Sequence, residues 1–361
     1  MTFDIRERLR VALLPPRYLM PAPAGIEIST SGVKAVRLAE TSRGIVLAAS
    51  AEVRFGADVV SAGEIVDAAK ASAAIAQAAK RAGIAEAHVA LAESKSYLFE
   101  ADVEGSNKEE WRVAVKQHLD ELVPLPPSNT AFDIVPVGRT NAGAMTVVGV
   151  GFAGRIVDGM LSALDAAGVT ACSLESESFA FARSLLPAGE TDTVLLIDIG
   201  KTTTKLVIVS RGIPRFTTTI GIGGHALTLA VQKHFGVTEL EARRIKVDRG
   251  IVPAPGNEDY LAAMLSTVSA VKDEIARNLE YWQGRAALSG HHEPVARAVI
   301  AGGNASVRGL PEYLEGALRI PVSLGDVFVN FASRDEWIPP FSYSESLAYA
   351  TAVGLALRAY L

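Results

Sequence analysis

Two stretches of the sequence share one pattern of residues that could bind a phosphate group. Each has a carboxylate at the end of an apolar segment, then a run rich in Ser, Thr or Gly, then a Lys seven positions after the carboxylate. The carboxylates are Glu27 and Asp198, and the lysines are Lys34 and Lys205. A strand–turn–strand of this kind points backbone N–H groups and hydroxyls at one spot beside the carboxylate, which suits a phosphate with its metal ion. The repeat predicts two related lobes that hold one nucleotide from both sides.

The residues of the two turns are the first candidate ligands. We expect Glu27 and Asp198 to hold Mg²⁺ through its water shell, because this ion prefers oxygen ligands and usually keeps several waters. The predicted phosphate ligands are Ser29, Thr30, Ser31, Lys34, Gly200, Lys201, Thr202 and Thr203. Read alone, each turn is also compatible with an ordinary β-hairpin. The nucleotide interpretation therefore depends on the repeat.

The composition is that of a folded protein with room for more than one domain. The chain has 361 residues, 49% of them hydrophobic and 21% charged, which is enough for two domains with separate cores. A net charge of −5 provides no general attraction to nucleic acid. The single cysteine, Cys172, cannot form an internal disulfide and fits a reducing compartment. The apolar stretch at 11–14 is broken by Pro15 and Pro16 and has no small-residue cleavage site after it, which argues against a secretory signal. The segment 347–361 is too short for a transmembrane helix, so we expect a cytoplasmic protein.

The hydrophobic pattern predicts an α/β protein that begins after a basic amphipathic arm at residues 1–24. The first lobe is assigned to 25–93 and 169–190, with strands at 25–29, 33–39, 45–53 and 87–91 and helices at 61–82 and 176–185. An insert is assigned to 94–168, with strands at 97–103, 131–138 and 145–152 and helices at 107–122 and 154–167. The proline-rich segment 123–127 cannot continue a helix, which favours a separate small subdomain here.

The second lobe is assigned to 191–342 and the closing helix to 343–361. The predicted strands are 193–199, 204–210, 213–220, 296–301 and 321–324. The predicted helices are 225–235, 239–247, 258–287, 309–318 and 344–361. Thr238 and Glu241 are spaced as a capping box, which marks the start of the helix at 239–247.

The order of hairpin, insert, second hairpin, strand with two glycines and closing helix resembles the actin, Hsp70 and sugar-kinase ATPase superfamily. Within it, the chain from residue 25 onward is most similar to the PilM family of type IV pilus proteins, and next to the FtsA family. The stretches that carry the PilM resemblance are 123–127, 298–311 and 350–357. The resemblance implies a two-lobed actin-like (ribonuclease H-like) α/β fold with a small α+β subdomain inserted in the first lobe. It also implies ATP and Mg²⁺ as cofactors.

The resemblance implies further site residues. The nucleotide would also contact Gly223, Gly224, Lys246, Gly302, Gly303 and Asn304. Glu175 matches by register the group that orients the attacking water, although an acid at a helix N-terminus is also explained by the helix dipole. The chain departs from the family pattern at Ser29 (usually Gly), at Arg243 (usually Glu) and at Ala305 (often Ser). A Cβ at Ser29 hinders the approach of the backbone to a phosphate, so we expect weakened binding.

These departures favour an adapter over a fast enzyme. The resemblance implies a scaffold that binds ATP and hydrolyses it slowly or not at all. It would dock the N-terminal cytoplasmic peptide of a PilN-like bitopic inner-membrane protein, at the cytoplasmic face of that membrane. Self-association stays open, and membrane contact would be indirect or through residues 1–17; no nucleic acid is expected. The alternatives are an FtsA-like membrane-associated, filament-forming ATPase and an actin-fold small-molecule kinase.

Overall fold

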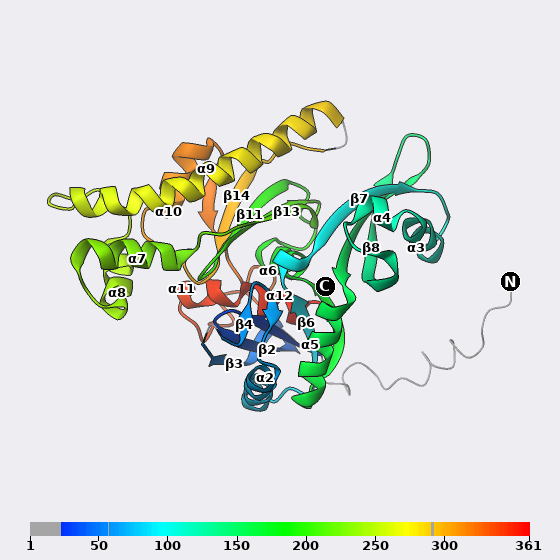
Figure 1. The fold of residues 1–361 in the computed structure, drawn as a ribbon, viewed down its shortest axis with the longest axis horizontal. Helices are drawn as coiled ribbons and strands as arrows, with labels where there is room; N and C mark the ends of the chain where they lie inside the picture. The colour runs from blue at the N-terminus through cyan, green and yellow to red at the C-terminus, as the bar shows by residue number, and fades with distance from the viewer. Residues whose placement is uncertain (1–22, 57, 290–291) are drawn as a thin grey trace.

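The structure, a computed structural model, describes residues 23–56, 58–289 and 292–361. The basic arm predicted at residues 1–24, with its contact to a membrane through residues 1–17, lies outside the described residues apart from its last two positions. Within the described ranges, two five-stranded sheets form the centres of two lobes and a three-stranded sheet forms the insert (Figure 1). This is the two-lobed α/β architecture that the repeat predicts.

The sheet of the first lobe has the strand order β10-β6-β1-β2-β3. Its strands are β1 (Ala24–Ser29), β2 (Gly32–Thr41), β3 (Gly44–Arg54), β6 (Glu86–Leu91) and β10 (Thr170–Ser176). Helix α2 (Ala68–Ala82) packs its alanine-rich face into the core of this lobe. It ends at Gly83 in the left-handed conformation, where the sequence predicts its end.

Helix α2 begins later than the predicted 61–82. Residues before it pair as the two short strands β4 (Val60–Ser61) and β5 (Glu64–Ile65). Asp67 then caps the helix, because its side chain accepts a hydrogen bond from the Lys70 N–H. A cap and a short hairpin at this point leave the helix no room to start earlier.

The insert has a small core of its own. Strands β7 (Tyr97–Val103), β9 (Met145–Ala153) and β8 (Thr130–Arg139) form its sheet in that order. Trp111, Val115 and Leu119 fill the space between this sheet and the helices α3 (Lys108–Gln117) and α4 (Leu119–Leu122). The single helix predicted at 107–122 is therefore two helices, which meet at His118 in a non-helical conformation.

Helix α5 (Gly154–Ala166) follows β9 but belongs to a different core. Its side chains Ile156, Met160 and Leu164 are buried in the core of the first lobe, together with residues of α2. At the start of α5, Arg155 pairs with Glu64 of β5. The helix thus fixes the insert to the first lobe.

The sheet of the second lobe has the strand order β13-β12-β11-β14-β15. The strands are β11 (Thr193–Ile199), β12 (Thr204–Ser210), β13 (Ile213–Ile220), β14 (Arg297–Ala301) and β15 (Val322–Leu324). The helices are α7 (Gly224–Phe235), α8 (Glu239–Arg249), α9 (Glu258–Ser289) and α10 (Leu310–Leu318). The capping box of Thr238 and Glu241 forms at the start of α8, as predicted. Figure 1 shows α9 lying along the outside of this lobe, with α7 and α8 at its far end.

Two helices cross between the lobes, α6 (Glu177–Leu185) and α12 (Ala350–Leu357). The closing helix predicted at 344–361 is interrupted: α11 (Tyr343–Ser346) and the 3-10 turn η4 (Leu347–Tyr349) come before α12. Tyr349 has non-helical dihedral angles, φ −104° and ψ 5°, which separate the two parts. A glycine in α12 allows a close crossing, because a Cβ on Gly354 would lie 1.7 Å from the Ala180 carbonyl oxygen of α6.

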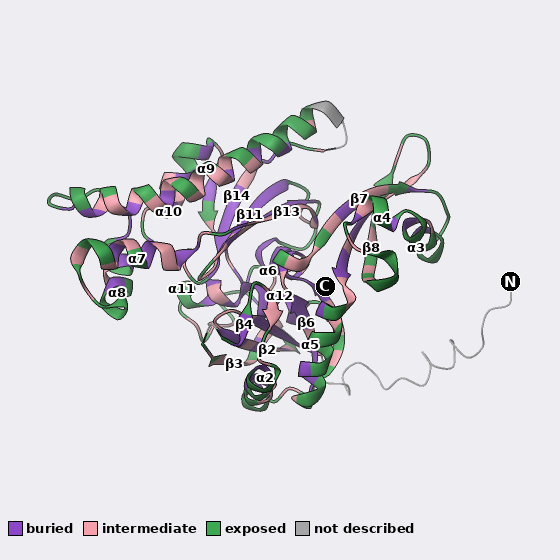
Figure 2. Cartoon of the chain, in the orientation of Figure 1, coloured by how far each residue is buried: buried purple, intermediate pink, exposed green. Residues whose placement is uncertain are grey.

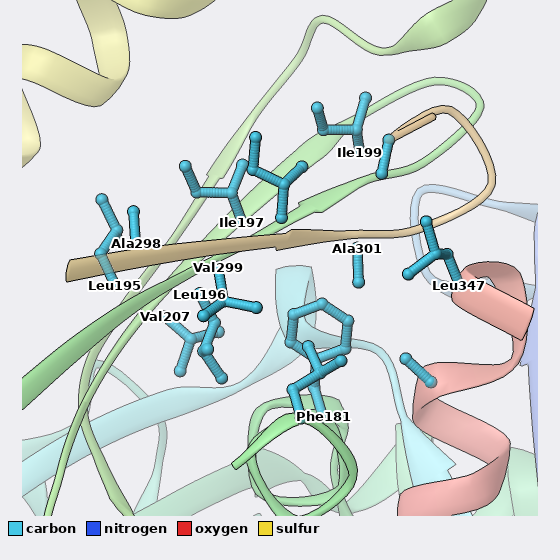
Figure 3. Close-up of a cluster of buried hydrophobic side chains, with 14 of the residues drawn as sticks. Phe181, Leu195, Leu196, Ile197, Ile199, Val207, Ala298, Val299, Ala301 and Leu347 are labelled. Atoms are coloured by element: carbon cyan, nitrogen blue, oxygen red, sulfur yellow. The ribbon is translucent and has the colours of Figure 1, made fainter. Parts of the chain in front are cut away.

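The largest core joins the crossing helices to the second lobe. Figure 3 shows the ring of Phe181, from α6, pointing toward strand β14 near Val299 and Ala301. Figure 2 shows the central strands of the second lobe as buried, whereas α8 at its far end is mostly exposed. The buried β11 and β14 therefore form a rigid support for the loops at their ends.

Candidate functional site

A cleft of about 740 Å³ lies between the two lobes, within the size range of small-molecule sites. All but three of the predicted site residues line it. The lining residues among them are Glu27, Ser29, Thr30, Ser31, Lys34, Asp198, Gly200, Lys201, Thr202, Thr203, Gly224, Lys246, Gly303 and Asn304. The exceptions are Glu175, Gly223 and Gly302. The fold thus brings the two repeated motifs together at one place, and their contact with a nucleotide stays a prediction.

The register of the two hairpins explains the spacing of acid and lysine. In β1–β2, Glu27 lies directly opposite Lys34, and in β11–β12, Asp198 lies directly opposite Lys205. Each lysine ammonium lies 3.4 Å from a carboxylate oxygen of its partner. Directly opposite residues in an antiparallel pair share one face of the sheet. Both pairs therefore face the cleft from opposite lobes.

Glu177 is a cleft residue that the sequence analysis misses. It is the first residue of α6, and the Lys205 ammonium lies 2.7 Å from its Oε2 atom. The same oxygen accepts a hydrogen bond of 2.8 Å from the Glu93 N–H. Lys205 itself was also left out of the predicted ligands, although the repeat places it where Lys34 stands. The symmetry of the two motifs is the signal that could have found it.

Burial dominates the electrostatics of these charged groups. Burial raises the pKa of Glu27 and of Asp198, even though Lys34 and Lys205 act in the opposite direction. Burial alone would lower the pKa of Lys205, but the carboxylates of Glu177 and Asp198 outweigh it and raise that pKa. Lys205 is therefore a permanent cation between two carboxylates.

The second turn is closed by backbone hydrogen bonds. The Gly200 N–H donates to the Thr203 carbonyl at 2.9 Å, and the first N–H groups of α7 donate to the carbonyls of Gly200 and Lys201. Gly223 lies behind this turn, since a Cβ there would come within 2.6 Å of the Thr203 nitrogen. Gly223 thus lets the turn and α7 pack together without lining the cleft itself.

The first turn uses its own hydroxyls. The Ser29 hydroxyl accepts from the Ser31 N–H at 3.3 Å and lies 3.0 Å from the Ser31 hydroxyl. Hydroxyls that bond to the backbone two residues later stabilise such turns. The Ser29 side chain therefore holds the shape of the turn, at the position where the resemblance led us to expect glycine.

The two glycines after β14 have different roles. Gly302 has φ +99°, and a Cβ on it would lie 2.3 Å from Asp198 Oδ1, so it makes room for that carboxylate behind the cleft wall. Gly303 lines the cleft, and a Cβ on it would meet only Ala348, at 3.7 Å. The backbone at Gly303 is thus open on the side where a ligand could approach.

Asn304 joins three segments of the second lobe. Its side-chain nitrogen donates to the Gly200 carbonyl at 3.0 Å, and its oxygen accepts from the Lys246 ammonium at 2.8 Å. Lys246 also donates to the carbonyl of Gly224 and to the hydroxyl of Thr228. Gly224 has to be glycine, because a Cβ there would lie 2.0 Å from atoms of the Asn304 side chain. Burial, with a smaller effect of Arg243, lowers the pKa of Lys246 to about 8.

Glu175 lies outside the cleft lining, in contrast to the catalytic role predicted for it. Arg183 binds its carboxylate with two hydrogen bonds of 2.8 and 3.0 Å, and Arg358 adds a third at 2.5 Å. Arg183 also donates to the Gly354 carbonyl. Strand β10 continues to Ser176, so the acid that begins α6 and reaches the cleft is Glu177. Glu175 instead ties α6 to α12.

Comparison with known proteins identifies the family. The family described as "Type IV pilus assembly protein PilM" matches residues 25–360. The chain belongs to the PilM family. A solved structure described as "PilM-PilN type IV pilus biogenesis complex" has 22% sequence identity and a TM-score of 0.76, over 94% of this chain and 99% of that chain.

Two other solved structures share the fold with this PilM-family chain. The ethanolamine utilization protein EutJ from Carboxydothermus hydrogenoformans has 16% identity and a TM-score of 0.52, over 95% of this chain and 90% of its own. MreB5 of Spiroplasma citri bound to AMPPNP has 14% identity and a TM-score of 0.52, over 91% and 93%. Identities this low show the fold alone, and they confirm the predicted actin-like architecture. The family match does not favour the filament-forming or kinase alternatives.

The described part of this PilM-family chain contains no helix with the length and apolar character needed to cross a membrane. The described residues also hold no group of three or more His, Cys, Asp or Glu side chains that could bind a metal ion directly. The turns, Gly303 and the lysines fit a polyphosphate. Glu27 and Asp198, the two acids predicted to hold the water shell of Mg²⁺, fit that ion less well, because each already has a lysine ammonium as its partner. Their role with Mg²⁺ stays a prediction.

Proposed function

We propose that this PilM-family chain is an ATP-binding adapter of a type IV pilus assembly complex that hydrolyses ATP slowly or not at all. The observation that carries this proposal is the convergence of two equivalent hairpins, with Glu27 and Asp198, on one cleft between the lobes. Open backbone at Gly303 and hydroxyl-rich turns are the features that polyphosphate and ribose groups need. The AMPPNP-bound MreB5 structure has the same fold, which supports a nucleotide as the ligand.

Slow hydrolysis is supported by the partners of the acids. A general base must be able to accept a proton from water at hydrogen-bond distance. Glu177 already accepts from Lys205 and from the Glu93 N–H, and Glu175 is held by two arginines away from the cleft lining. The ammonium of Lys205 therefore occupies the Glu177 oxygen that would have to accept the proton. The cleft is thus better suited to holding ATP than to activating water.

The adapter role is supported by the family and by the matched complex of PilM with PilN. We propose that this chain docks the N-terminal cytoplasmic peptide of a PilN-like bitopic inner-membrane protein, in a groove between the first lobe and the insert. The chain would then lie at the cytoplasmic face of the inner membrane through its partner. Direct membrane contact through residues 1–17 and self-association are further parts of this proposal that need separate tests.

Nucleotide binding is tested by isothermal titration calorimetry of the purified full chain with ATP, followed by measurement of phosphate release. We expect saturable binding and turnover far below the roughly 1 s⁻¹ at which typical enzymes begin. Asp198→Asn should weaken binding, whereas Asp133→Asn, an exposed change on the insert, should not. Rapid ATP turnover that is lost in Asp198→Asn would contradict the adapter proposal. Absence of any ATP binding would contradict the proposal that the cleft binds a nucleotide.

Partner binding is tested by capture of proteins from a native lysate on the immobilised full chain, with and without ATP. We expect enrichment of a bitopic inner-membrane protein with a short cytoplasmic N-terminus. A synthetic peptide of that N-terminus should compete for capture, and a scrambled peptide should not. Capture that the peptide leaves unchanged would contradict the proposed docking mode. Addition of liposomes to the purified chain, without the partner, tests the contribution of residues 1–17 separately.

A further inference from the structure

The cleft carries a positive charge in a protein that is negatively charged overall. Among the described residues that line it, six are Lys or Arg and four are Asp or Glu, whereas the whole chain has a net charge of −5. The basic residues are Lys34, Arg54, Lys201, Lys205, Arg243 and Lys246. A cleft with this excess attracts a polyphosphate before any metal ion is counted.

Lys205 occupies the position between the acids. Its ammonium lies 2.7 Å from Glu177 Oε2 and 3.4 Å from Asp198 Oδ2, and its side chain is only 19% exposed. Glu27 also lies close enough to contribute to its electrostatics. The lysine comes from β12, whereas Glu177 begins the crossing helix α6. One cation from the protein therefore balances acids from two different elements.

Two of these carboxylates, Glu27 and Asp198, were expected to order the water shell of Mg²⁺. A divalent cation beside Lys205 would meet a like charge at close range, which is unfavourable where water screens little. An ammonium has three N–H donors, so Lys205 can pair with both carboxylates and still donate to a phosphate oxygen. It supplies in one side chain the two effects of the metal, charge neutralisation and a link between acid and phosphate.

We propose that Lys205 takes the place of the divalent cation in this cleft, so that a nucleoside triphosphate binds without Mg²⁺. This inference rests on the proposed nucleotide function. Lys34 has the equivalent position in the first hairpin and pairs with Glu27, whereas Lys205 contacts two carboxylates of the cleft, those of Glu177 and Asp198. Lys205 is thus the specificity-determining residue that selects metal-free nucleotide.

The test compares ATP binding to the full chain in excess Mg²⁺ and in excess EDTA, at equal ionic strength, by isothermal titration calorimetry. We expect dissociation constants that agree within about threefold. Binding that weakens tenfold or more in EDTA overturns the inference about Lys205 and leaves the proposed function intact. Absence of binding in both buffers overturns the proposed function itself. The wild-type chain alone distinguishes these outcomes.

Variants then assign the effect to Lys205. Lys205→Thr leaves Asp198 and Glu177 without their cation, so binding should become dependent on Mg²⁺, with at least about a tenfold difference between the two buffers. Lys201→Thr is the matched control in the same turn, and it should weaken binding equally in both buffers. Lys205→Arg keeps the charge and should retain binding in EDTA. Equal behaviour of Lys205→Thr and Lys201→Thr would overturn the assignment, and a thermal melt of each variant verifies that it is folded.

Discussion

Gly354 is the point where the two crossing helices approach each other most tightly, and its replacement by alanine should destabilise the protein. A Cβ at this position would lie 1.7 Å from the Ala180 carbonyl oxygen. An ordinary carbon–oxygen contact is about 3.3 Å or longer, so α12 would have to move by about 1.5 Å. No rotation of a side chain can relieve the clash, because both atoms are fixed by the backbone.

The size of the effect follows from two opposing terms. Overpacking a tight core costs about 1–3 kcal/mol, and a clash between backbone-fixed atoms belongs at the upper end. Alanine gains about 1 kcal/mol over glycine inside a helix. The net loss for Gly354→Ala is therefore about 2 kcal/mol. In a chain of 361 residues about 1.3 °C of Tm corresponds to each kcal/mol, so the Tm should fall by about 3 °C.

Gly159 provides the matched control. It lies inside helix α5, and a Cβ on it would meet no atom within 4 Å. Gly159→Ala should therefore raise the Tm by about 1 °C, because only the propensity gain of about 1 kcal/mol applies. Both variants are measured by differential scanning fluorimetry against the wild type. If Gly354→Ala melts at or above the wild-type temperature, the close crossing of α6 and α12 is wrong.

Three other predictions concern the residues around the cleft. The Lys246 ammonium loses its proton near its pKa of about 8, so ATP affinity should fall as the pH rises from about 7 to about 9. Lys246→Met should bind ATP more weakly, and its affinity should not change over this pH range. A wild-type affinity that is constant from about pH 7 to about pH 9 would contradict the role of the ammonium. Glu175→Gln leaves two arginines without their carboxylate and should cost about 3 kcal/mol of stability, measured by a thermal melt. Its ATP affinity should be unchanged. A loss of ATP affinity in the folded variant would show that Glu175 does contribute to the nucleotide site. Gly224→Ala should destabilise the chain because its Cβ would overlap Asn304, and the double variant with Asn304→Ala should recover part of the loss; additive effects in this double-mutant cycle would refute the contact.

The paired hairpins could be predicted because their evidence is repeated in the sequence. An acid followed seven positions later by a lysine is the sequence form of a directly opposed cross-strand pair, and both Glu27–Lys34 and Asp198–Lys205 have this register. Strand bounds in the second lobe were equally clear, because apolar β-strands end there at polar turns. The repeat also located most of the predicted residues that line the cleft, since both turns follow directly from it.

The predictions for Glu175, for the closing helix and for the start of α2 differ from the structure, because each depends on features of the fold that the sequence does not display. Glu175 and Glu177 differ by two positions, and only the length of β10 decides which acid begins α6 and reaches the cleft. The closing helix is apolar and continuous in sequence, and its break at Tyr349 is visible only in the folded backbone. The start of α2 was placed too early because the two-residue strands β4 and β5 are too short to have a periodic signal.

The contacts of Glu175 and Gly354 have a consequence for motion. Arg183 of α6 binds Glu175, near the end of β10, and the Gly354 carbonyl of α12, and Arg358 also binds the Glu175 carboxylate. We therefore expect the two crossing helices to move as one rigid body. A change in the angle between the lobes must arise in the segments at the ends of this pair, at 186–192, where Gly189 has a φ of +83°, and at 347–349. A partner that holds 186–192 would set how far the lobes can open without touching the cleft itself, whereas 347–349 includes the cleft residues Leu347 and Ala348.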